Sequence, residues 1–364
     1  MPPIEEFRFG IEHEFAVIDR EGRFRDFTNT TFEEFDRVIE SLPVIETDYP
    51  GLRVGDLGIK NKRWYIEGFE RFSESGEYLR TDPKGFEIRT PICDSLDEAI
   101  GVLKADLERW AEAAAPYGYR PAHTSLNPFQ PEFVPIPDLN AWEESHRRTP
   151  EELTAHIHML TYGPDMSFSH PALSAERAID ISKKLTHYSP FIVPFSFSSP
   201  FFRGELWGGY SRRTYYRTGA RPSALVFVED DAERIPSFPT LTDKARLPAE
   251  IGRIEFKAFD CVAEVETFRS LGALLLGVAL DTKLPGRALV PDGALHKLSA
   301  VRAFHDDDIH RGAGEVLAAA REALPHDLRA HLEPLEELLD TRTTPADRMI
   351  EVFRETGDIV RAIG

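Results

Sequence analysis

The sequence predicts an α+β domain in which an antiparallel sheet carries helices on its apolar face. Residues 7–17, 86–92 and 251–260 each alternate apolar and ionisable side chains with the two-residue period of a strand. Amphipathic helical patterns lie between and after these segments. Strands and helices do not alternate as regular βαβ units, which disfavours a parallel sheet.

The first strand, residues 7–17, divides its side chains between two faces. The apolar residues share one parity: Phe7, Phe9, Ile11, Phe15 and Val17. Arg8, Glu12 and Glu14 share the other parity, so the two glutamates lie side by side on an ionic face. Neighbouring carboxylates repel each other unless a cation lies between them.

A helix and a set of hairpins are predicted next. Residues 32–42 have apolar side chains at helical spacing, and Thr31 stands before them as a cap. Residues 63–90 alternate aromatic and charged side chains across Ser75-Gly76 and Lys84-Gly85, which is the pattern of a meander of hairpins.

The second strand, at the end of that meander, places Glu87 and Arg89 on its ionic face. A long amphipathic helix follows and ends before residue 116. Ser95 and Glu98 have the spacing of a capping box at its start.

Residues 154–162 are predicted as a further strand, with His156 and His158 on one face. A single strand histidine is more often structural than a ligand, but two at this spacing favour a ligand role. Further helices are predicted at residues 174–187, 263–281 and 312–324, and in two pieces between 326 and 363.

The third strand, residues 251–260, places Arg253, Glu255 and Lys257 on its ionic face. The ionic face of any one strand could simply meet water. Taken together, carboxylates that cluster with histidines and arginines between strongly apolar neighbours favour a metal site. The oxygen-dominated set suits Mg²⁺ or Mn²⁺ better than Zn²⁺, and it comprises Glu12, Glu14, Glu87 and Glu255 with one or two histidines.

Residues 201–222 concentrate positive charge in an otherwise acidic chain. They contain Arg203, Arg212, Arg213, Arg217 and Arg221 beside Trp207, Tyr210, Tyr215 and Tyr216. Guanidinium groups bind carboxylates and phosphates through two parallel hydrogen bonds. The glycines of this segment favour a substrate-binding loop, and an exposed loop whose arginines pair with surface acids is the alternative.

The composition bounds the class of protein. With 364 residues, 41% of them hydrophobic, and no linker-like segment, we expect a single catalytic domain over residues 1–364, with a helical C-terminal region at about 312–364. A formal charge of −19 disfavours nucleic acid as a partner. No segment resembles a signal peptide or a membrane span, and two cysteines indicate buried free thiols, so we expect a cytoplasmic protein. Glycine-rich phosphate-binding motifs are missing, so metal and arginines would have to hold any ATP.

Five motifs in order then resemble the landmarks of a known family. They are FGIEHEF at 9–15, FEIRTP at 86–91, HIH at 156–158, SSPFF at 198–202, and RIEFK at 253–257 followed by Asp260. Over about residues 7–285 the chain resembles the carboxylate–amine ligase family that includes bacterial glutamate–cysteine ligases.

The resemblance implies a glutamine-synthetase-like fold, with a curved antiparallel sheet whose ionic face binds ATP and two or three Mg²⁺ ions. It implies that the γ-carboxylate of glutamate is joined to an amine such as cysteine, at the expense of ATP and through an acyl phosphate, as in the synthesis of glutathione-like thiols. Small-molecule substrates are therefore the expected partners, and a homo-oligomer is left open.

The resemblance also assigns roles to residues. The implied metal ligands are Glu12, Glu14, Glu87, His156 and Glu255, and Glu12, Glu255, Lys257 and Arg253 are implied in catalysis. His156, Lys257 and Arg253 would contact the nucleotide, and Arg212, Arg213, Arg89 and Tyr210 would hold the substrate. The family usually has an arginine where this chain has Lys257, so either Lys257 or Arg253 would neutralise the transferring phosphate.

Two other functions fit the same residues. A metal-dependent amide hydrolase would use metal-activated water without ATP. A non-catalytic small-molecule-binding protein could also share the fold, because fold does not fix function.

Overall fold

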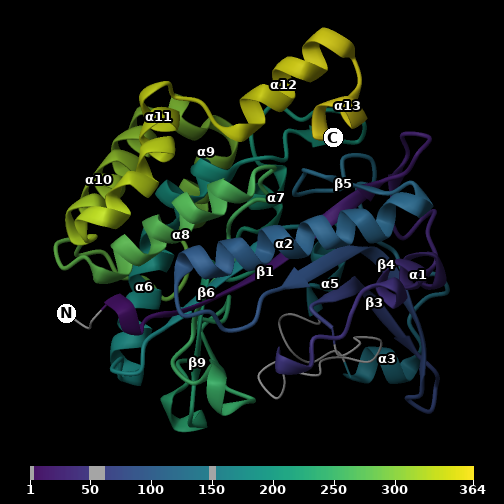
Figure 1. Ribbon diagram of the computed structural model, residues 1–364, viewed down its shortest axis with the longest axis horizontal. Coiled ribbons are helices and arrows are strands. Elements are labelled where there is room, and N and C mark those ends of the chain that lie inside the picture. The colour runs from purple at the N-terminus through teal and green to yellow at the C-terminus, as the bar shows by residue number, and fades with distance from the viewer. Residues whose placement is uncertain (1–3, 49–61, 147–152) are drawn as a thin grey trace.

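The computed structural model describes residues 4–48, 62–146 and 153–364 (Figure 1). Within these residues a nine-stranded sheet has the order β10-β9-β11-β6-β1-β4-β3, and β2 and β5 also pair with β1. The strands are β1 (Arg8–Ile18), β2 (Phe24–Arg25), β3 (Trp64–Phe72), β4 (Tyr78–Arg89), β5 (Arg120–Ala122), β6 (Pro164–Ser169), β9 (Ala224–Val228), β10 (Thr242–Lys244) and β11 (Ile254–Phe256), with β7 (Phe201–Phe202) and β8 (Glu205–Leu206) in a separate hairpin. The sequence predicts an antiparallel sheet. Among the described strands β10 and β9 pair parallel, so the sheet is mixed.

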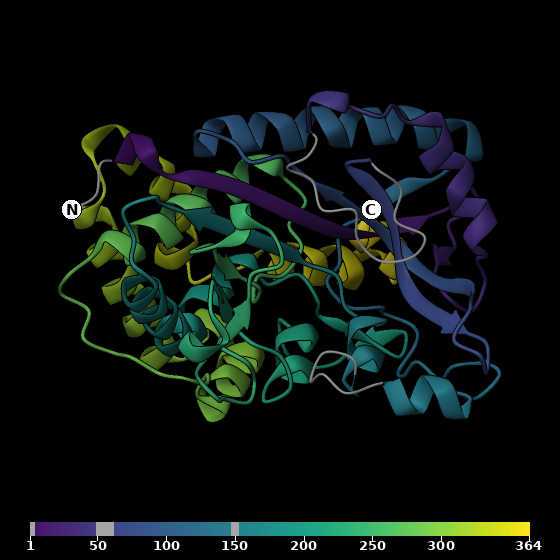
Figure 2. The same ribbon diagram turned by 90° about the horizontal axis from the view of Figure 1, so that it is seen from below.

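Helices cover the apolar face of the sheet, as the sequence predicts. The helices of the described residues are α1 (Phe32–Ser41), α2 (Leu96–Ala114), α3 (Ala141–His146), α5 (Ala155–His158), α6 (Ala175–Ile192), α7 (Arg212–Arg217), α8 (Val265–Leu280), α9 (Gly293–Arg302), α10 (Asp307–Ala323), α11 (Glu333–Asp340), α12 (Pro345–Thr356) and α13 (Ile359–Ile363). Helices α1 and α2 pack on β1, β3 and β4, and α6 packs on β9 and β11. Figure 2 shows α2 along one side of β1 and α3 on the opposite side.

One hydrophobic core joins these layers. It includes Phe15 of β1, Trp110 of α2, Leu274 of α8 and Leu335 of α11. Cys93 and Cys261 are both buried free thiols, as predicted. No helix in the described part of the chain combines the length and apolar character needed to cross a membrane.

The predicted helix starts agree with the caps in the structure. Thr31 and Glu34 form a capping box at α1, and the Ser95 side chain accepts the Glu98 N–H at the start of α2. The Glu98 carboxylate accepts the Asp94 N–H, so the second half of the predicted box is displaced by one residue. Helices α3, α7 and α9 of the described residues are not predicted by the sequence, and α5 lies where a strand is predicted.

Only one of the two predicted turns at residues 63–90 exists. Strands β3 and β4 are joined by a turn that includes Gly76, whose φ is 81°. Gly85 lies inside β4, where an added Cβ would stand 2.4 Å from the Phe15 carbonyl oxygen. A glycine is needed there for close approach of two strands and not for a turn.

The strand predicted at residues 154–162 is wrong. Residues 155–158 form the helical turn α5, and the strand of this region that joins the sheet beside β1 is β6, which begins at Pro164. Residues two apart on a helix point about 200° apart, so the two histidines diverge. His156 is exposed, whereas His158 faces the sheet.

Candidate active site

The ionic face of the sheet lines one wall of a cavity of about 980 Å³. Strands β1, β3, β4, β6 and β11 supply the acidic wall, and α7 and the residues just after it supply arginines. Because the helices cover the other face, the two faces divide the molecule into a core side and a ligand side.

A first acidic group, here called the carboxylate cluster, comprises Glu12, Asp165 and Glu255. Their carboxylate oxygens all lie within 4.8 Å of one another. Strand pairing brings them together, because Glu12 is directly opposite Asp165 and Glu255 pairs with Ser167 on the same strand, β6. The Lys257 ammonium contacts Asp165 and Glu255, and Arg253 Nη2 lies 3.2 Å from a Glu255 oxygen.

The carboxylate cluster holds more buried negative charge than its own cations neutralise. Burial raises the pKa of Asp165 to about 7. The positive charge of Lys257 lowers this pKa, and the negative charges of Glu255 and Glu12 raise it. Burial also raises the pKa of Glu12, and the Glu255 charge adds to it. Burial opposes ionisation of Glu255 too, but Lys257 and Arg253 outweigh it and hold its pKa at about 2. Three crowded carboxylates are suited to a hard divalent cation such as Mg²⁺ or Mn²⁺.

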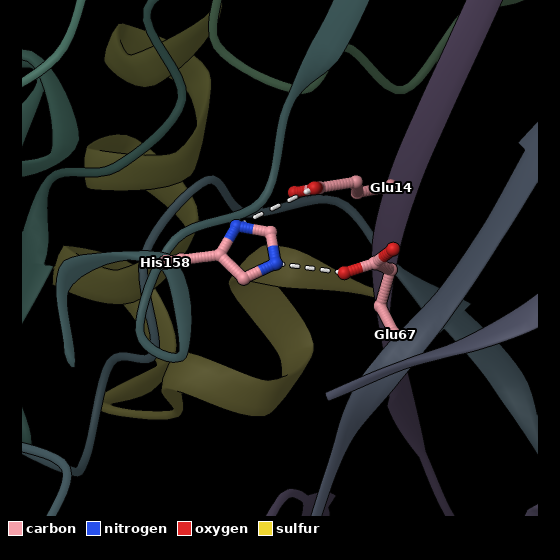
Figure 3. A group of neighbouring side chains, drawn as sticks. All are labelled: Glu14, Glu67 and His158. Carbon is pink, nitrogen blue, oxygen red and sulfur yellow. Dashed lines mark hydrogen bonds and ion pairs between the residues drawn. The ribbon is translucent and has the colours of Figure 1, made fainter. Parts of the chain in front are cut away.

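A second group, here called the histidine cluster, comprises Glu14, Glu67 and His158 (Figure 3). His158 Nε2 lies 2.7 Å from a Glu67 oxygen, and His158 Nδ1 lies 3.8 Å from a Glu14 oxygen. The Lys84 ammonium donates to Glu14 at 3.0 Å. Burial would raise the pKa of Glu67, but the hydrogen bond from His158 and the surrounding positive charge hold it at about 2.

Glu87 lies next to both clusters but belongs to neither. It is directly opposite Glu14 across the strands and hydrogen-bonds the Tyr65 hydroxyl. Burial raises its pKa well above the usual value, and the charges of Glu67, Glu12 and Glu14 raise it further. The Glu87 carboxyl is therefore harder to ionise than an exposed glutamate, and a nearby cation would favour its charged form.

Helix α7 turns two arginines toward the acidic wall. Arg213 and Arg217 both line the cavity and both donate to the Lys257 carbonyl, at 3.3 and 3.0 Å. An added Cβ on Gly163 would stand 2.5 Å from Arg213 Nη2, so this glycine makes room for the guanidinium. Burial and the charges of Arg213 and Arg221 lower the pKa of Arg217 to about 9. Such a concentration of positive charge favours an anionic ligand.

Not all the predicted substrate residues reach the cavity. Arg89 and Arg213 line it, but Arg212 and Tyr210 are not among its lining residues. The Arg212 guanidinium lies over the rings of Phe202, Trp207 and Tyr215, at 4.6–5.4 Å from their centroids. Consecutive helical residues point about 100° apart, so Arg212 and Arg213 cannot face the same ligand.

The predicted metal ligands separate into two places. Glu12 and Glu255 belong to the carboxylate cluster, and Glu14 belongs to the histidine cluster. The structure does not bring exposed His156 to either cluster, and His158 lies where a histidine was expected. Sequence reasoning missed Asp165 and Glu67, although both alternate with apolar neighbours in the way that identified the other strands.

A curved sheet with an acidic face opposed by arginines defines an α+β protein of the glutamine-synthetase-like ligase fold. Three solved structures share the fold, each with a TM-score of 0.56: a bifunctional glutathione synthetase from Pasteurella multocida (12% identity, 99% of this chain, 51% of that chain), a glutamate–cysteine ligase from Francisella tularensis in complex with AMP (13%, 100%, 88%), and the ligase PafA in complex with the prokaryotic ubiquitin-like protein Pup (11%, 99%, 73%). At these identities the similarity shows the fold alone.

The family follows from the sequence. Residues 8–238 match the model of glutamate-cysteine ligase family 2 (GCS2), and the chain belongs to this family. Putative glutamate–cysteine ligases are 26% identical over 242 residues (Rubrobacter xylanophilus, 62% of this chain) and 29% identical over 168 residues (Rhodospirillum rubrum, 42% of this chain). The matched regions span 57% and 39% of the length of these two relatives.

Proposed function

We propose that the protein is an ATP-dependent carboxylate–amine ligase. It would phosphorylate a carboxylate, that of glutamate or a similar acid, and pass the acyl group to an amine such as cysteine. The observation that carries the proposal is a single cavity in which a buried carboxylate cluster opposes the arginines of α7. Membership of the glutamate–cysteine ligase family supports it.

In this proposal Glu12, Asp165 and Glu255 hold a divalent cation. Bound there, Mg²⁺ or Mn²⁺ would neutralise the phosphate oxygens of ATP. Asp165 was not among the predicted ligands, and with it the ligand set of this cluster consists of oxygen atoms alone.

Cationic side chains would neutralise the rest of the transferring phosphate. Arg213 and Arg217 offer fixed guanidinium groups, because backbone carbonyls hold both. The Nε atoms of Arg213 and Arg253 are both buried, and neither has a hydrogen-bond partner among the described residues. Lys257 and Arg253 also carry charge at this point, but both already contact Glu255, so their substitution would disturb the metal ligand as well.

Arg89 is the proposed partner of the substrate carboxylate. It is buried, lines the cavity and lies opposite Glu12 across the strands. Water exclusion would protect the acyl phosphate until the amine attacks it. We further propose that residues 1–364 act as one catalytic domain, with the helices after residue 312 completing its core.

The test is release of phosphate from ATP with a panel of carboxylates and amines. The proposal expects release that requires both co-substrates and a divalent cation, and the Glu255→Gln variant serves as the inactive control. An amide hydrolase would cleave γ-glutamyl amides without ATP. A binding protein would neither release phosphate from ATP nor cleave γ-glutamyl amides. Either of these results would reject the proposal.

A further inference from the structure

The histidine cluster contains a fourth member that carries a positive charge. The Lys84 ammonium lies 3.0 Å from Glu14 Oε2, 3.4 Å from His158 Nδ1 and 3.9 Å from Glu67 Oε2. It is therefore within 4 Å of an atom of each residue that could bind a metal there. The Lys84 side chain is 0% exposed.

Backbone carbonyls fix this ammonium in place. The His158 carbonyl oxygen accepts from Lys84 Nζ at 3.1 Å, and the Thr161 carbonyl oxygen accepts at 2.9 Å. The face of the Tyr162 ring lies 5.5 Å away. With Glu14, these acceptors satisfy the three N–H groups of the ammonium, and the carbonyls cannot turn away as side chains can.

The strand geometry directs the lysine to this position. Glu67 pairs with Gly85 and Gly68 pairs with Pro83, so Lys84 is the extra residue of a β-bulge in β4. A bulge re-aims a side chain relative to the regular alternation of the strand. Lys84 has the parity of Phe86 and Ile88 of the apolar face, yet its ammonium reaches the ionic side.

His158 is also satisfied without a metal. Its Nε2 lies 2.7 Å from a Glu67 oxygen and its Nδ1 lies 3.4 Å from the Lys84 ammonium. A histidine that binds a metal must offer a bare nitrogen to it. Both ring nitrogens already have partners, so the residues present do not fit a divalent ion.

We propose that Lys84 is a built-in cation that takes the place of a divalent ion at the histidine cluster, so that the metal requirement falls on the carboxylate cluster alone. The inference deepens the proposed metal-dependent function and rests on it. Lys257 differs from Lys84 because its side chain is 17% exposed and contacts two carboxylates that a metal could share. The chain would then bind fewer protein-held divalent ions than the resemblance to its family implies.

The test is a titration of the full chain with Mn²⁺, without nucleotide, in which free Mn²⁺ is measured by electron paramagnetic resonance. We expect the wild type to bind Mn²⁺ and the Glu255→Gln variant to lose this binding. Glu67→Gln should change the Mn²⁺ affinity by less than about twofold, which is well below the tenfold change that corresponds to 1.4 kcal/mol. Lys84→Met should add one Mn²⁺ per chain, and the double variant Lys84→Met/Glu67→Gln should lose it again.

Lys184→Met is the matched control. Lys184 is a second fully buried lysine whose ammonium donates to backbone carbonyls, those of Val278 and Asp281, and it lies outside the cavity lining. It should leave Mn²⁺ binding unchanged.

Three results would overturn the inference: loss of a wild-type Mn²⁺ site in Glu67→Gln, no added site in Lys84→Met, or no wild-type binding that depends on Glu255. If Lys84→Met does not fold, the comparison of wild type with Glu67→Gln and Glu255→Gln decides the question alone. Because the assay contains no ATP or amine, a lack of ligase turnover would reject the proposed function and leave this measurement intact.

Discussion

Asp260→Asn should weaken both the fold and nucleotide binding, because Asp260 anchors the helix that carries the cavity arginines. Its carboxylate is fully buried and accepts from the Ser198 N–H at 3.0 Å and the Ser199 hydroxyl at 2.8 Å. It also accepts from the hydroxyl of Ser211, the N-cap of α7, and lies 3.7 Å from Arg213 Nη1.

The size of the effect follows from these partners. Asparagine offers one oxygen, which can keep the Ser198 and Ser199 contacts, and places an amide N–H₂ toward Ser211 and Arg213. Loss of one partner of a buried ion pair costs about 3–5 kcal/mol. Since Arg213 keeps its bond to the Ala258 carbonyl, we expect the lower end, about 3 kcal/mol of unfolding free energy. Nucleotide affinity should fall about tenfold, which corresponds to 1.4 kcal/mol.

Urea unfolding at pH 8 and equilibrium binding of ADP with Mn²⁺ measure the two effects. Burial raises the pKa of Asp260, so the measurement is made on the alkaline side, at pH 8. The control is Asp281→Asn, because Asp281 is also buried, accepts backbone N–H groups and lies 3.9 Å from Lys184. Asp281 is remote from the cavity lining, so its variant should lose stability but keep nucleotide affinity. A loss below about 1 kcal/mol in Asp260→Asn, or an equal fall in affinity in both variants, would refute the reasoning.

The remaining predictions concern the proposed chemistry and the pH dependence of stability. Glu255→Gln should reduce turnover at least 100-fold, as expected for a group that aligns charge in the transition state. The melting temperature should change little, because the loss of the contacts with Lys257 and Arg253 is offset by relief of the repulsion from Glu12 and Asp165; wild-type turnover would remove Glu255 from the mechanism. Lys257→Ala and Arg253→Ala should both lower the single-turnover rate of phosphoryl transfer, and an unchanged rate in Lys257→Ala with a collapsed rate in Arg253→Ala would assign the phosphate to Arg253 alone. Burial lowers the pKa of His296 from 6.5 to about 4, so the folded state excludes a proton that the unfolded chain binds. Stability should therefore fall by about 3 kcal/mol as the pH falls from 6.5 to 4. His296→Gln should reduce this slope in urea melts, and an unchanged slope would contradict the assignment.

The parity of side chains predicted the acidic wall well. Glu12, Glu14, Glu87 and Glu255 all line the cavity, because β1, β11 and the part of β4 after its bulge pair regularly and their apolar residues meet a covered face. Alternation is a reliable guide where burial of one face fixes the strand register. The helix starts were equally predictable, since the caps at Thr31 and Ser95 are local hydrogen bonds.

Short segments were the source of the errors. Polar and apolar side chains alternate at residues 156–158, but so short a segment also fits one turn of helix. In the structure these residues belong to the helix α5. The strand that fills the gap, β6, supplies Asp165 instead. In the same way, the sequence predicts a loop at residues 201–222 in which adjacent arginines could share one ligand, whereas the structure has the six-residue helix α7 there.

The direction of the Lys84 side chain cannot be predicted from the alternation of residues in its strand. A regular strand would direct this residue to the helices, with Phe86 and Ile88, where an ammonium has no partner. One extra residue against β3 turns it to the acidic side, where the carbonyl oxygens of His158, the last residue of α5, and of Thr161 accept from its ammonium. The register shift is a property of the β3–β4 pair and not of either sequence segment, so it becomes visible only when both strands are paired. The charge that balances Glu14 and Glu67 is therefore set by strand pairing, and in our proposal the number of divalent ions that the chain binds is set with it.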